Sequence, residues 1–527
     1  MTLGRAMATI GGWTVLSRIT GLVREMLVAR YLGAGFVADA FFVAFRFPNL
    51  FRSLFAEGAF NPAFVPLFAG KLEAGGRAAA HEFAEQCLAV LFWTLLLFVA
   101  AMEIAMPWAM DVLALGFGDE PGKLELATEL SRICFPYLLL ISMVSLQSGV
   151  LNALGRFAAA AGTPVLLNVV SVAVLVGLAP YMPTPGHAMA WGVFASGVAQ
   201  FAWLVASVRR AGMPLRPRMP KLSPEVKAML RRVVPGAIGA GVYQINLAVN
   251  TMIASTTIQG AVSYLNYAER VNQLPLGVVG VAAGTALLPM LARQIKQGQI
   301  EAAQESQNRA MELVLLLTLP ATAALIAIGH PIVAILFQRG HFNADDTNAV
   351  TGALAMLAGG LPAYVLIKVL TPAFFAREDT RTPVRIAMLS MAINIVLNLI
   401  LVRFMSYLGM ALATASSAWI NVILLVWVVE RRKWFVIDKR TERRLVRMVL
   451  ASAIMGGILF AAQGELAGLL ARPGVRFAAL AVLIALGIAV YAGAAIALGA
   501  AHWREVRGWL RRGPRPGGGE TISPPDF

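Results

Sequence analysis

Four arginines, Arg18, Arg24, Arg52 and Arg270, lie inside apolar stretches that are long enough to cross a membrane. An arginine at the centre of a spanning helix costs about 2.5 to 3.5 kcal/mol, so four such residues represent roughly 10 kcal/mol or more of retained free-energy cost. Hydrocarbon offers nothing that would compensate an unpaired guanidinium group. The pattern therefore predicts that something negative meets these four side chains.

The first helix that must position them carries Arg18 near the middle of the membrane and Arg24 about 9 Å further out. Ser17, Gly21 and Arg24 lie on one stripe of that helix, which lets another backbone or a head group approach closely. We predict that acidic and polar residues support the four arginines, and these are Asp39, Asn49, Glu57 and Glu269.

A purely structural alternative exists for the same residues. Asp39 with Arg24, or Glu57 with Arg52 or Arg18, would then be buried ion pairs that fix helix packing. Arg46 and Lys368 also lie within predicted spans. Their alternative position is at the membrane interface, which long basic side chains can reach from within a span. Glu103 is expected at that interface.

The 527 residues are 58% hydrophobic and 14% charged, with a mean hydropathy of +0.71. These values are typical of an integral membrane protein, and apolar runs of about 20 residues indicate helices rather than a β-barrel. We therefore expect an all-α polytopic protein with about 14 transmembrane helices. The predicted spans are 7–29, 36–69, 86–108, 129–151, 158–180, 187–208, 233–257, 261–291, 310–329, 347–375, 384–402, 406–430, 446–466 and 476–499.

The distribution of basic residues predicts the orientation, because Lys and Arg collect in cytoplasmic loops. With the N-terminus inside, the inner segments hold 31 of the 44 Lys and Arg residues. Seven others fall at outer ends, namely Arg30, Lys123, Arg132, Arg339, Arg403, Arg472 and Arg476. Both termini are thus expected in the cytoplasm, with the first span retained. The net charge of +16 is explained by topology and anionic lipid, so no nucleic-acid partner is expected.

A weak internal repeat appears when the chain is shifted by 223 residues, which places Ala38 on Ala261 and Asn49 on Asn272. The second and eighth predicted spans are both long and contain prolines, which makes them candidate hinges. We predict two six-helix lobes followed by two extra helices. The predicted parts are lobes 1–208 and 233–430, basic cytoplasmic linkers 209–232 and 431–445, additional helices 446–499, and a cytoplasmic tail 500–527 with a disordered end.

Other kinds of site find little support in the sequence. Cys87 and Cys134 have no ligand-like spacing, and the five histidines are scattered near span ends, so no metal site or disulfide framework is indicated. No phosphate-binding loop, nucleophile elbow or pair of catalytic carboxylates stands out. We therefore expect neither an enzyme nor a cofactor.

Several motifs of the sequence are specific enough to compare with known families. They are the segment Ser17 to Glu25, Ala38 to Phe45, Pro48-Asn49-Leu50, Phe55 to Phe60 and Tyr267 to Arg270. Together they resemble the motifs of the MurJ (MviN) family of lipid II flippases. This resemblance extends along the whole chain in length and number of spans, although the last two spans match mainly in character. The resemblance implies a multi-pass protein of the bacterial inner membrane within the multidrug, oligosaccharidyl-lipid and polysaccharide exporter superfamily.

The resemblance also implies a function. Members carry lipid II, the undecaprenyl-diphosphate-linked disaccharide pentapeptide, outward for peptidoglycan synthesis. The positions of Arg18, Arg24, Arg52 and Arg270 line a central cavity there, Asp39 matches another important position, and the two extra helices hold the lipid tail. We expect Arg18, Arg24 and Arg270 to bind the diphosphate and Arg52 to support the sugar or peptide, since guanidinium forks match phosphate oxygens. Membrane lipids and cell-wall synthesis proteins are the further expected partners.

One position departs from the family. Some relatives bind sodium through an acidic residue of the seventh span, whereas this chain offers Gln244, Asn246 and Asn250 there. This makes sodium coupling doubtful, although Asn394 and Asn398 of the eleventh span could still contribute oxygen ligands. The membrane potential remains as a driving force for an exported anion.

Two rival functions share the fold that the resemblance implies. A flippase for another polyprenyl-diphosphate-linked polysaccharide would use the same diphosphate handle. A multidrug cation antiporter would want acidic cavity walls, and the predominance of basic residues within the spans disfavours it.

Overall fold

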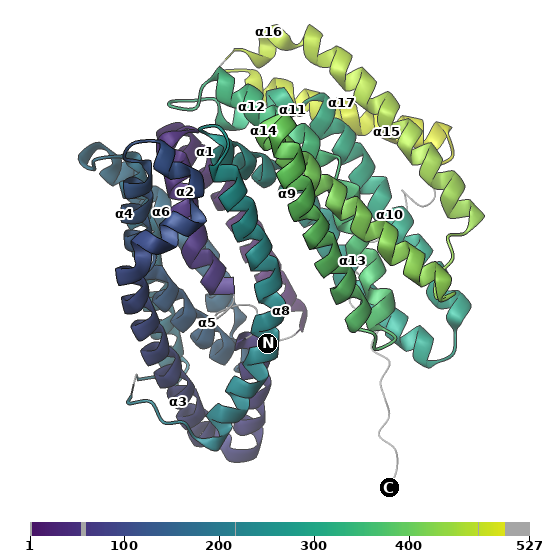
Figure 1. The fold of residues 1–527 in the computed structure, drawn as a ribbon. Coiled ribbons are helices and arrows are strands. Elements are labelled where there is room, and N and C mark those ends of the chain that lie inside the picture. The colour runs from purple at the N-terminus through teal and green to yellow at the C-terminus, as the bar shows by residue number, and fades with distance from the viewer. Residues whose placement is uncertain (1–2, 54–59, 217, 473, 501–527) are drawn as a thin grey trace.

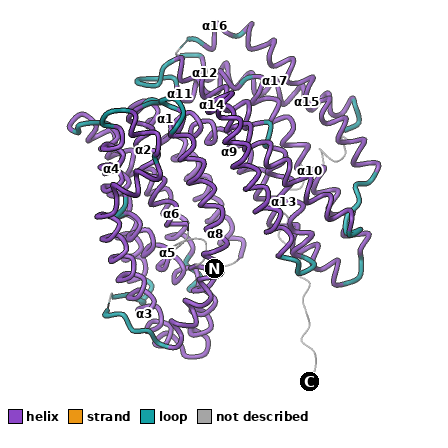
Figure 2. Tube along the Cα trace, viewed as in Figure 1, coloured by secondary structure: helices purple, strands orange, loops and turns teal. Residues whose placement is uncertain are grey.

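The computed structural model describes residues 3–53, 60–216, 218–472 and 474–500 of the chain. Every secondary-structure element in these ranges is an α-helix or a short 3-10 helix, as Figure 2 shows. The helices form two bundles that approach each other at the top of Figure 1 and separate toward the bottom. The all-α membrane fold is thereby confirmed, while the number of fourteen spans and the positions of the termini stay predictions.

The first bundle is built from the N-terminal elements. These are α1 (Leu3–Leu32), α2 (Phe36–Arg52), α3 (Phe60–Leu113), η2 (Leu115–Asp119), α4 (Lys123–Cys134), α5 (Tyr137–Ala153), α6 (Phe157–Leu178), η3 (Ala179–Tyr181) and α7 (Pro185–Arg210).

The second bundle follows, and a helix pair covers the side of it that faces away from the first bundle (Figure 1). The bundle contains α8 (Pro224–Ser255), α9 (Ala261–Lys296), α10 (Ile300–Ala327), α11 (Gly329–Phe337), α12 (Ala344–Ala358), α13 (Leu361–Phe375) and α14 (Arg381–Arg431). The covering pair is α15 (Lys439–Glu465) and α17 (Arg476–Ala497), joined by the short α16 (Ala467–Leu470). Helix α8 packs against both α3 and α14 and so lies between the two bundles.

Several predicted spans differ in detail from the observed helices. The expected span 129–151 is divided between α4 and α5 beside Pro136, and 347–375 is divided between α12 and α13 beside Gly360 and Pro362. Proline cannot donate its backbone nitrogen and disfavours helix in the residue before it, which explains these breaks. The eighth span is not interrupted, because α9 remains helical across Pro275.

Two other expected spans are found as two helices that are joined by a kink within one segment. The predicted spans 384–402 and 406–430 both belong to α14, which bends at Ser406, where φ is 51°. A positive φ is costly for a residue with a side chain, so the bend is maintained by the packing around it. The second span ends as α2 at Arg52.

Nine described segments are long and apolar enough to cross a membrane by length and composition. Helices α1, α2, α8 and α9 line the space between the bundles, and they carry the arginines, acids and amides described below.

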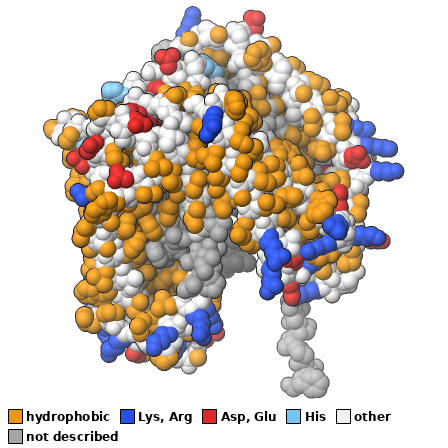
Figure 3. Space-filling model, viewed as in Figure 1, with side chains coloured by type: hydrophobic (Ala, Val, Ile, Leu, Met, Phe, Trp, Pro, Cys, Tyr) orange, Lys and Arg blue, Asp and Glu red, His pale blue; other side chains and the backbone are white. Residues whose placement is uncertain are grey.

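The surface charge agrees with the predicted orientation. Figure 3 shows Lys and Arg side chains gathered at the lower ends of both bundles, below wide apolar surfaces. Basic residues favour the cytoplasmic side of a membrane protein. The lower end in this view is therefore the expected cytoplasmic end, and the end at which the bundles meet is the expected outer end.

Candidate functional site: an arginine-lined cavity between the bundles

A cavity of about 270 Å³ lies between the two bundles. Helix α1 supplies Arg24 and Glu25 to its wall, and α2 supplies three further polar residues. The second bundle contributes mainly from α9. The remaining charged and amide residues of the lining are Arg46, Asn49, Arg52, Gln244, Asn266, Glu269, Arg270 and Gln273.

Glu25 is a buried acid that bridges arginines of both bundles. Its Oε1 accepts a hydrogen bond from Arg24 Nη2 at 2.7 Å and lies 3.6 Å from Arg270 Nε. The side chains of Glu25 and Arg24 are 9% and 12% exposed, whereas that of Arg270 is 44% exposed. Arg270 therefore keeps donors available to the cavity while Glu25 partly neutralises it.

Arg52 belongs to the same cavity and is oriented by its own helix. Its Nε donates to Asn49 Oδ1 at 3.0 Å, and Asn49 Nδ2 donates to the Phe45 carbonyl oxygen at 3.1 Å. Asn49 thus orients Arg52 through this hydrogen bond. Glu57, the other candidate near Arg52, lies outside the described residues.

Arg18 reaches the second bundle at a different place. Its guanidinium group lies directly against Gly277 of α9, where a Cβ atom would collide with it. Neither Ser17 nor Gly21 lines the cavity. The Ser17 carbonyl oxygen accepts a hydrogen bond from Asn168 Nδ2 of α6 at 3.0 Å, and a Cβ on Gly21 would stand 3.4 Å from that nitrogen. The small-residue stripe of α1 therefore packs against a helix.

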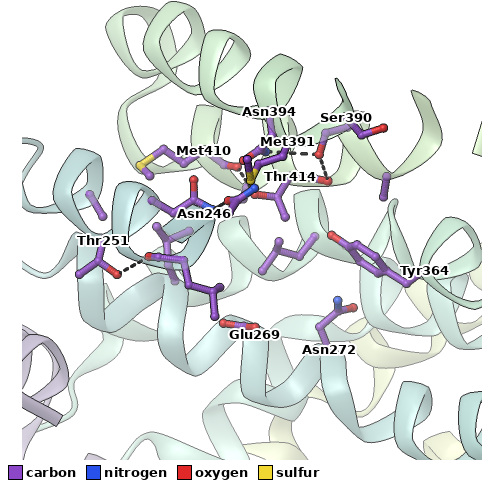
Figure 4. A pocket seen from close by; sticks show the side chains of 18 of the residues that line it. Asn246, Thr251, Glu269, Asn272, Tyr364, Ser390, Met391, Asn394, Met410 and Thr414 are labelled. Carbon is purple, nitrogen blue, oxygen red and sulfur yellow. Dashed lines mark hydrogen bonds between the residues drawn. The ribbon is translucent and has the colours of Figure 1, made fainter. Parts of the chain in front are cut away.

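A second cavity, of about 660 Å³, adjoins the first and extends into the second bundle. Arg46 and Glu269 line both cavities. Arg46 Nη1 donates to Thr251 Oγ1 at 3.0 Å, and its Nη2 lies 3.9 Å from Glu269 Oε2. Arg46 thus points inward. Figure 4 shows Glu269, Asn272 and Tyr364 on one side of this space and a cluster around Asn246, Asn394 and Thr414 on the other.

The amides of that cluster bond to one another. Asn398 Nδ2 donates to Asn250 Oδ1 at 2.7 Å and to Asn394 Oδ1 at 3.3 Å. Asn250 Nδ2 donates in turn to Asn246 Oδ1 at 2.9 Å. Within the part of the chain that the structure describes, no group of three or more His, Cys, Asp or Glu residues could hold a metal ion. The amide oxygens of Asn246, Asn250 and Asn394 are thus engaged in a neutral network, whereas the buried Asn398 Oδ1 has no hydrogen-bond partner among the described residues.

Asp39 occupies neither cavity and does not pair with Arg24. It is 1% exposed at the outer end, where Lys123 Nζ of α4 donates to its Oδ2 at 3.1 Å. Its carboxylate also accepts bonds from the second bundle, from Gly260 N at 2.7 Å and from Ser263 N and Oγ at 2.9 and 2.6 Å. Asp39 therefore ties α2 to the start of α9.

An apolar contact reinforces this connection. Tyr267 of α9 is fully buried and donates its hydroxyl to the Gly33 carbonyl oxygen at 2.9 Å. Its ring packs edge-on against Phe42 of α2 at 5.4 Å and contacts Phe337 at 5.1 Å. The bundles are thus sealed to each other at the outer end, above the arginine cavity.

Two charged residues of the cavity were missed or left open by the sequence. The predicted partners of Arg24 do not include Glu25, and adjacency gives no signal for such a pair because neighbouring helical residues point about 100° apart. For Arg46 the sequence predicts either a position at the interface or one in the interior. The sequence indicates that Arg24 and Arg270 need a negatively charged partner, but it does not identify the acid that provides the charge.

Comparisons with known proteins point to one family. The family model described as lipid II flippase MurJ matches residues 28–470. The probable lipid II flippase MurJ of Rhizobium meliloti (strain 1021) is 44% identical over 531 residues, covering 99% of each chain. The lipid II flippase MurJ of Burkholderia cenocepacia is 36% identical over 499 residues, covering 94% of this chain and 97% of that one.

A solved structure is also similar. The structure titled "Lipid II flippase MurJ, inward closed conformation" superposes with a TM-score of 0.77 at 25% identity, covering 95% of this chain and 99% of that chain.

Proposed function

The chain belongs to the lipid II flippase MurJ family, and from that premise we propose that it moves lipid II from the inner to the outer leaflet of the bacterial inner membrane. The observation that carries this proposal is the cavity between the bundles, which Arg24, Arg52 and Arg270 line and in which Glu25 pairs with both Arg24 and Arg270. A diphosphate offers the several anionic oxygens that such donors match.

Glu25 acts in this proposal as the counter-charge of the empty protein. Without substrate it neutralises Arg24 and Arg270, which would otherwise be unpaired cations inside a membrane. When lipid II enters, its diphosphate takes the donors of Arg270 first, because that side chain is the more exposed of the two. Arg18 completes the site from the other edge, where Gly277 leaves room for its guanidinium group.

The remaining polar surface fits the rest of the substrate. The larger cavity is lined by amides and hydroxyls, which can bond to the sugars and peptide of lipid II. Helices α15 and α17 lie outside the bundle and are proposed to accommodate the lipid tail. Transport then proceeds by alternating access: the outer connection through Asp39 opens while the inner ends of the bundles close.

We also propose that sodium does not drive this cycle. The amides of α8 and α14 bond to one another without a carboxylate. They therefore lack the negative charge that would offset the free-energy cost of dehydrating a cation. An exported anion gains about 2.3 kcal/mol per charge from 100 mV across the membrane. Replacing external sodium with choline should leave transport intact, whereas collapsing the potential should stop it.

The test of the flippase function uses cells depleted of their own lipid II flippase. Lipid II exposed at the outer face is measured for the parent protein and for Arg24→Gln and Arg270→Gln at matched expression. The parent should restore exposure and both variants should not. Arg403→Gln changes an exposed arginine outside both cavities and should behave like the parent.

Other outcomes decide against the proposal. If the parent is inserted but restores nothing, a different polyprenyl-diphosphate-linked saccharide becomes the substrate. If the two cavity variants transport normally, the arginines have a packing role only.

A further inference from the structure

Basic residues are rare at the expected outer end, and the structure divides them by their partners. Lys123 bonds to Asp39 and Glu120, at 3.1 and 2.8 Å. A second group, Arg30, Arg339 and Arg476, has no ion pair with a carboxylate among the residues that the structure describes. We call this group the arginine trio.

The trio comes from three parts of the molecule that meet at one point. Arg30 lies in the last turn of α1, Arg339 follows α11, and Arg476 begins α17. Helix α11 packs against both α1 and α17, near the top of Figure 1. The loop after α11 is fixed to the first bundle, because His341 N donates to the Arg30 carbonyl oxygen at 3.0 Å.

Two guanidinium groups of the trio have an unsatisfied donor. The Nε atoms of Arg339 and Arg476 are buried and have no hydrogen-bond partner within the described ranges. Arg339 Nη2 donates to the Ile335 carbonyl oxygen at 2.5 Å, which holds the side chain in place. Burying a polar group without a partner is costly, so such donors call for a ligand or for bound water.

The charges of the trio also act on one another. Burial lowers the pKa of Arg339 below its usual range, and the positive charges of Arg476 and Arg30 lower it further. Like charges at close range are unfavourable unless an anion lies between them. The trio is therefore a cationic site whose own chain supplies no neutralising group among the described residues.

The surroundings are apolar on the side of α17. Phe477, Val482 and Ile488 are 50%, 57% and 67% exposed, as expected for a helix face in contact with hydrocarbon. A ligand of this site can therefore place an anionic group on the arginines and an apolar chain along α17. Phosphate is the anion that guanidinium forks match best, and a lipid carries both parts.

We propose that Arg30, Arg339 and Arg476 form a binding site for a lipid-borne phosphate group in the outer leaflet. The site is distinct from the arginine cavity, because it lies at the outer ends of α1, α11 and α17 and none of its residues lines either cavity. The phosphate connects the first bundle, the second bundle and the additional helix pair, and so stabilises the arrangement that is closed at the outer end.

Two sources carry this chemistry, an anionic phospholipid of the membrane and the polyprenyl diphosphate of released substrate. Binding is measured with the full-length protein in a neutral detergent, using fluorescent short-chain phosphatidylglycerol, phosphatidylcholine and a fluorescent prenyl diphosphate. The parent is compared with Arg339→Gln and Arg476→Gln. Arg403→Gln is the matched control.

We expect the trio variants to lose about tenfold in affinity for phosphatidylglycerol, in affinity for the prenyl diphosphate that binds in addition to one in the central cavity, or in both. Affinity for phosphatidylcholine and the affinities of the control should be unchanged. A loss of affinity for phosphatidylglycerol identifies the ligand as a membrane phospholipid. A loss of affinity that is restricted to the prenyl diphosphate identifies it as released substrate. Unchanged affinities for both anions overturn the proposal. If Arg339→Gln does not fold, Arg476→Gln carries the same expectation, because Arg476 lies at the edge of a helix.

The outcome is independent of transport. Binding to the central cavity remains in every trio variant, since Arg24, Arg52 and Arg270 are unchanged. A protein that fails to move lipid II can therefore still bind a phosphate group at the arginine trio, and a working flippase can lack this binding.

Discussion

In the proposed transport cycle, Glu25 serves both the empty and the loaded protein through the two arginines beside it. Its carboxylate contacts Arg24 of its own helix and Arg270 of the opposite bundle. A carboxylate and a phosphate compete for the same guanidinium donors. Glu25 thus lowers the free-energy cost of burying the two arginines. In the proposed cycle it also selects for ligands that are anionic enough to displace its carboxylate from them.

This competition predicts a gain of affinity on removing the acid. Glu25→Gln should bind a soluble prenyl diphosphate roughly tenfold more tightly, since an interaction worth about 1 kcal/mol or more no longer has to be broken. Its melting temperature should fall, because two cations lose their partner. Binding is measured by fluorescence anisotropy on purified protein, with Glu103→Gln of α3 as the control. Weaker binding by Glu25→Gln would mean that Glu25 helps to hold the ligand.

Gly277 gives a second test at the residue scale. In Gly277→Ala the new methyl group would occupy the place of the Arg18 guanidinium, so Arg18 must move away from its position. Alanine also favours a helix over glycine by about 0.5 to 1 kcal/mol. We therefore expect transport to fall as in Arg18→Gln while thermal stability does not.

The control for that substitution is Gly177→Ala on α6, where a Cβ atom would meet nothing within 4 Å. Outward lipid II is measured in depleted cells, and melting temperatures on purified protein. Normal transport by Gly277→Ala would show that the contact of Arg18 with α9 is not needed.

At the scale of the elements, hydrogen-bonded loop residues fix how the long helices begin and end. Helix α12 begins with a capping box between Asn343 and Asp346, and α15 begins at Asp438, whose side chain accepts from Thr441 N at 2.6 Å. Asp379 acts similarly between α13 and α14. It accepts bonds from Thr382 N and Oγ1 at 3.0 and 2.6 Å, and from Arg432 Nη1 at 2.6 Å. These bonds hold together the two ends of α14.

Asp379 predicts a pH dependence of stability. Burial would raise its pKa, but the bonds from Thr382 and Arg432 outweigh burial and lower the pKa from 3.8 to about 2. A lowered pKa means that the stabilisation is complete above pH 4 and is lost as the pH falls toward 2. The contribution is about 1 kcal/mol or less, because Arg432 is partly exposed to solvent screening.

The experiment compares melting temperatures between pH 5 and pH 2. Asp379→Asn should be less stable than the parent at pH 5 and should lose less stability on acidification. Asp345→Asn, a change in the exposed first turn of α12, should follow the parent. Equal pH profiles for the parent and Asp379→Asn would contradict the role given to these bonds.

For the whole molecule, the outer seal decides which end of the central space is closed. Asp39 receives three hydrogen bonds from α9 and one from Lys123 of α4, and Tyr267 adds an apolar contact between the bundles. These interactions exist only while the outer ends touch. They must therefore be broken in the step that opens the cavity outward.

Asp39→Asn should shift that equilibrium toward the outward-open form. A hydrogen bond to a charged group contributes about 1.5 to 3 kcal/mol, so weakening these bonds changes the ratio of the two states by roughly tenfold or more. The shift is measured as faster labelling of Asn49→Cys from outside the cell with an impermeant maleimide, in a background lacking both native cysteines. Ser131→Ala, a change of a buried residue of α4, is the control. Unchanged labelling would show that the apolar contacts alone keep the outer end closed.

The sequence by itself determined the class of protein and the kind of chemistry. Apolar runs of about 20 residues require helices in a membrane, because each backbone polar group must be satisfied within its own segment. Arginines retained inside those runs require negative partners for the same reason. Both are local requirements, so they can be predicted from composition and spacing.

Only the tertiary structure decided which charges meet. Helical periodicity says which residues share a face of one helix, but the pairing of faces depends on how two bundles pack against each other. For this reason Asp39, predicted beside the arginines, contacts Lys123 and α9 instead. Glu25 became the partner of Arg270, and Arg46 turned toward Thr251. The need for a partner is a property of the residue, whereas the identity of the partner is a property of the packing.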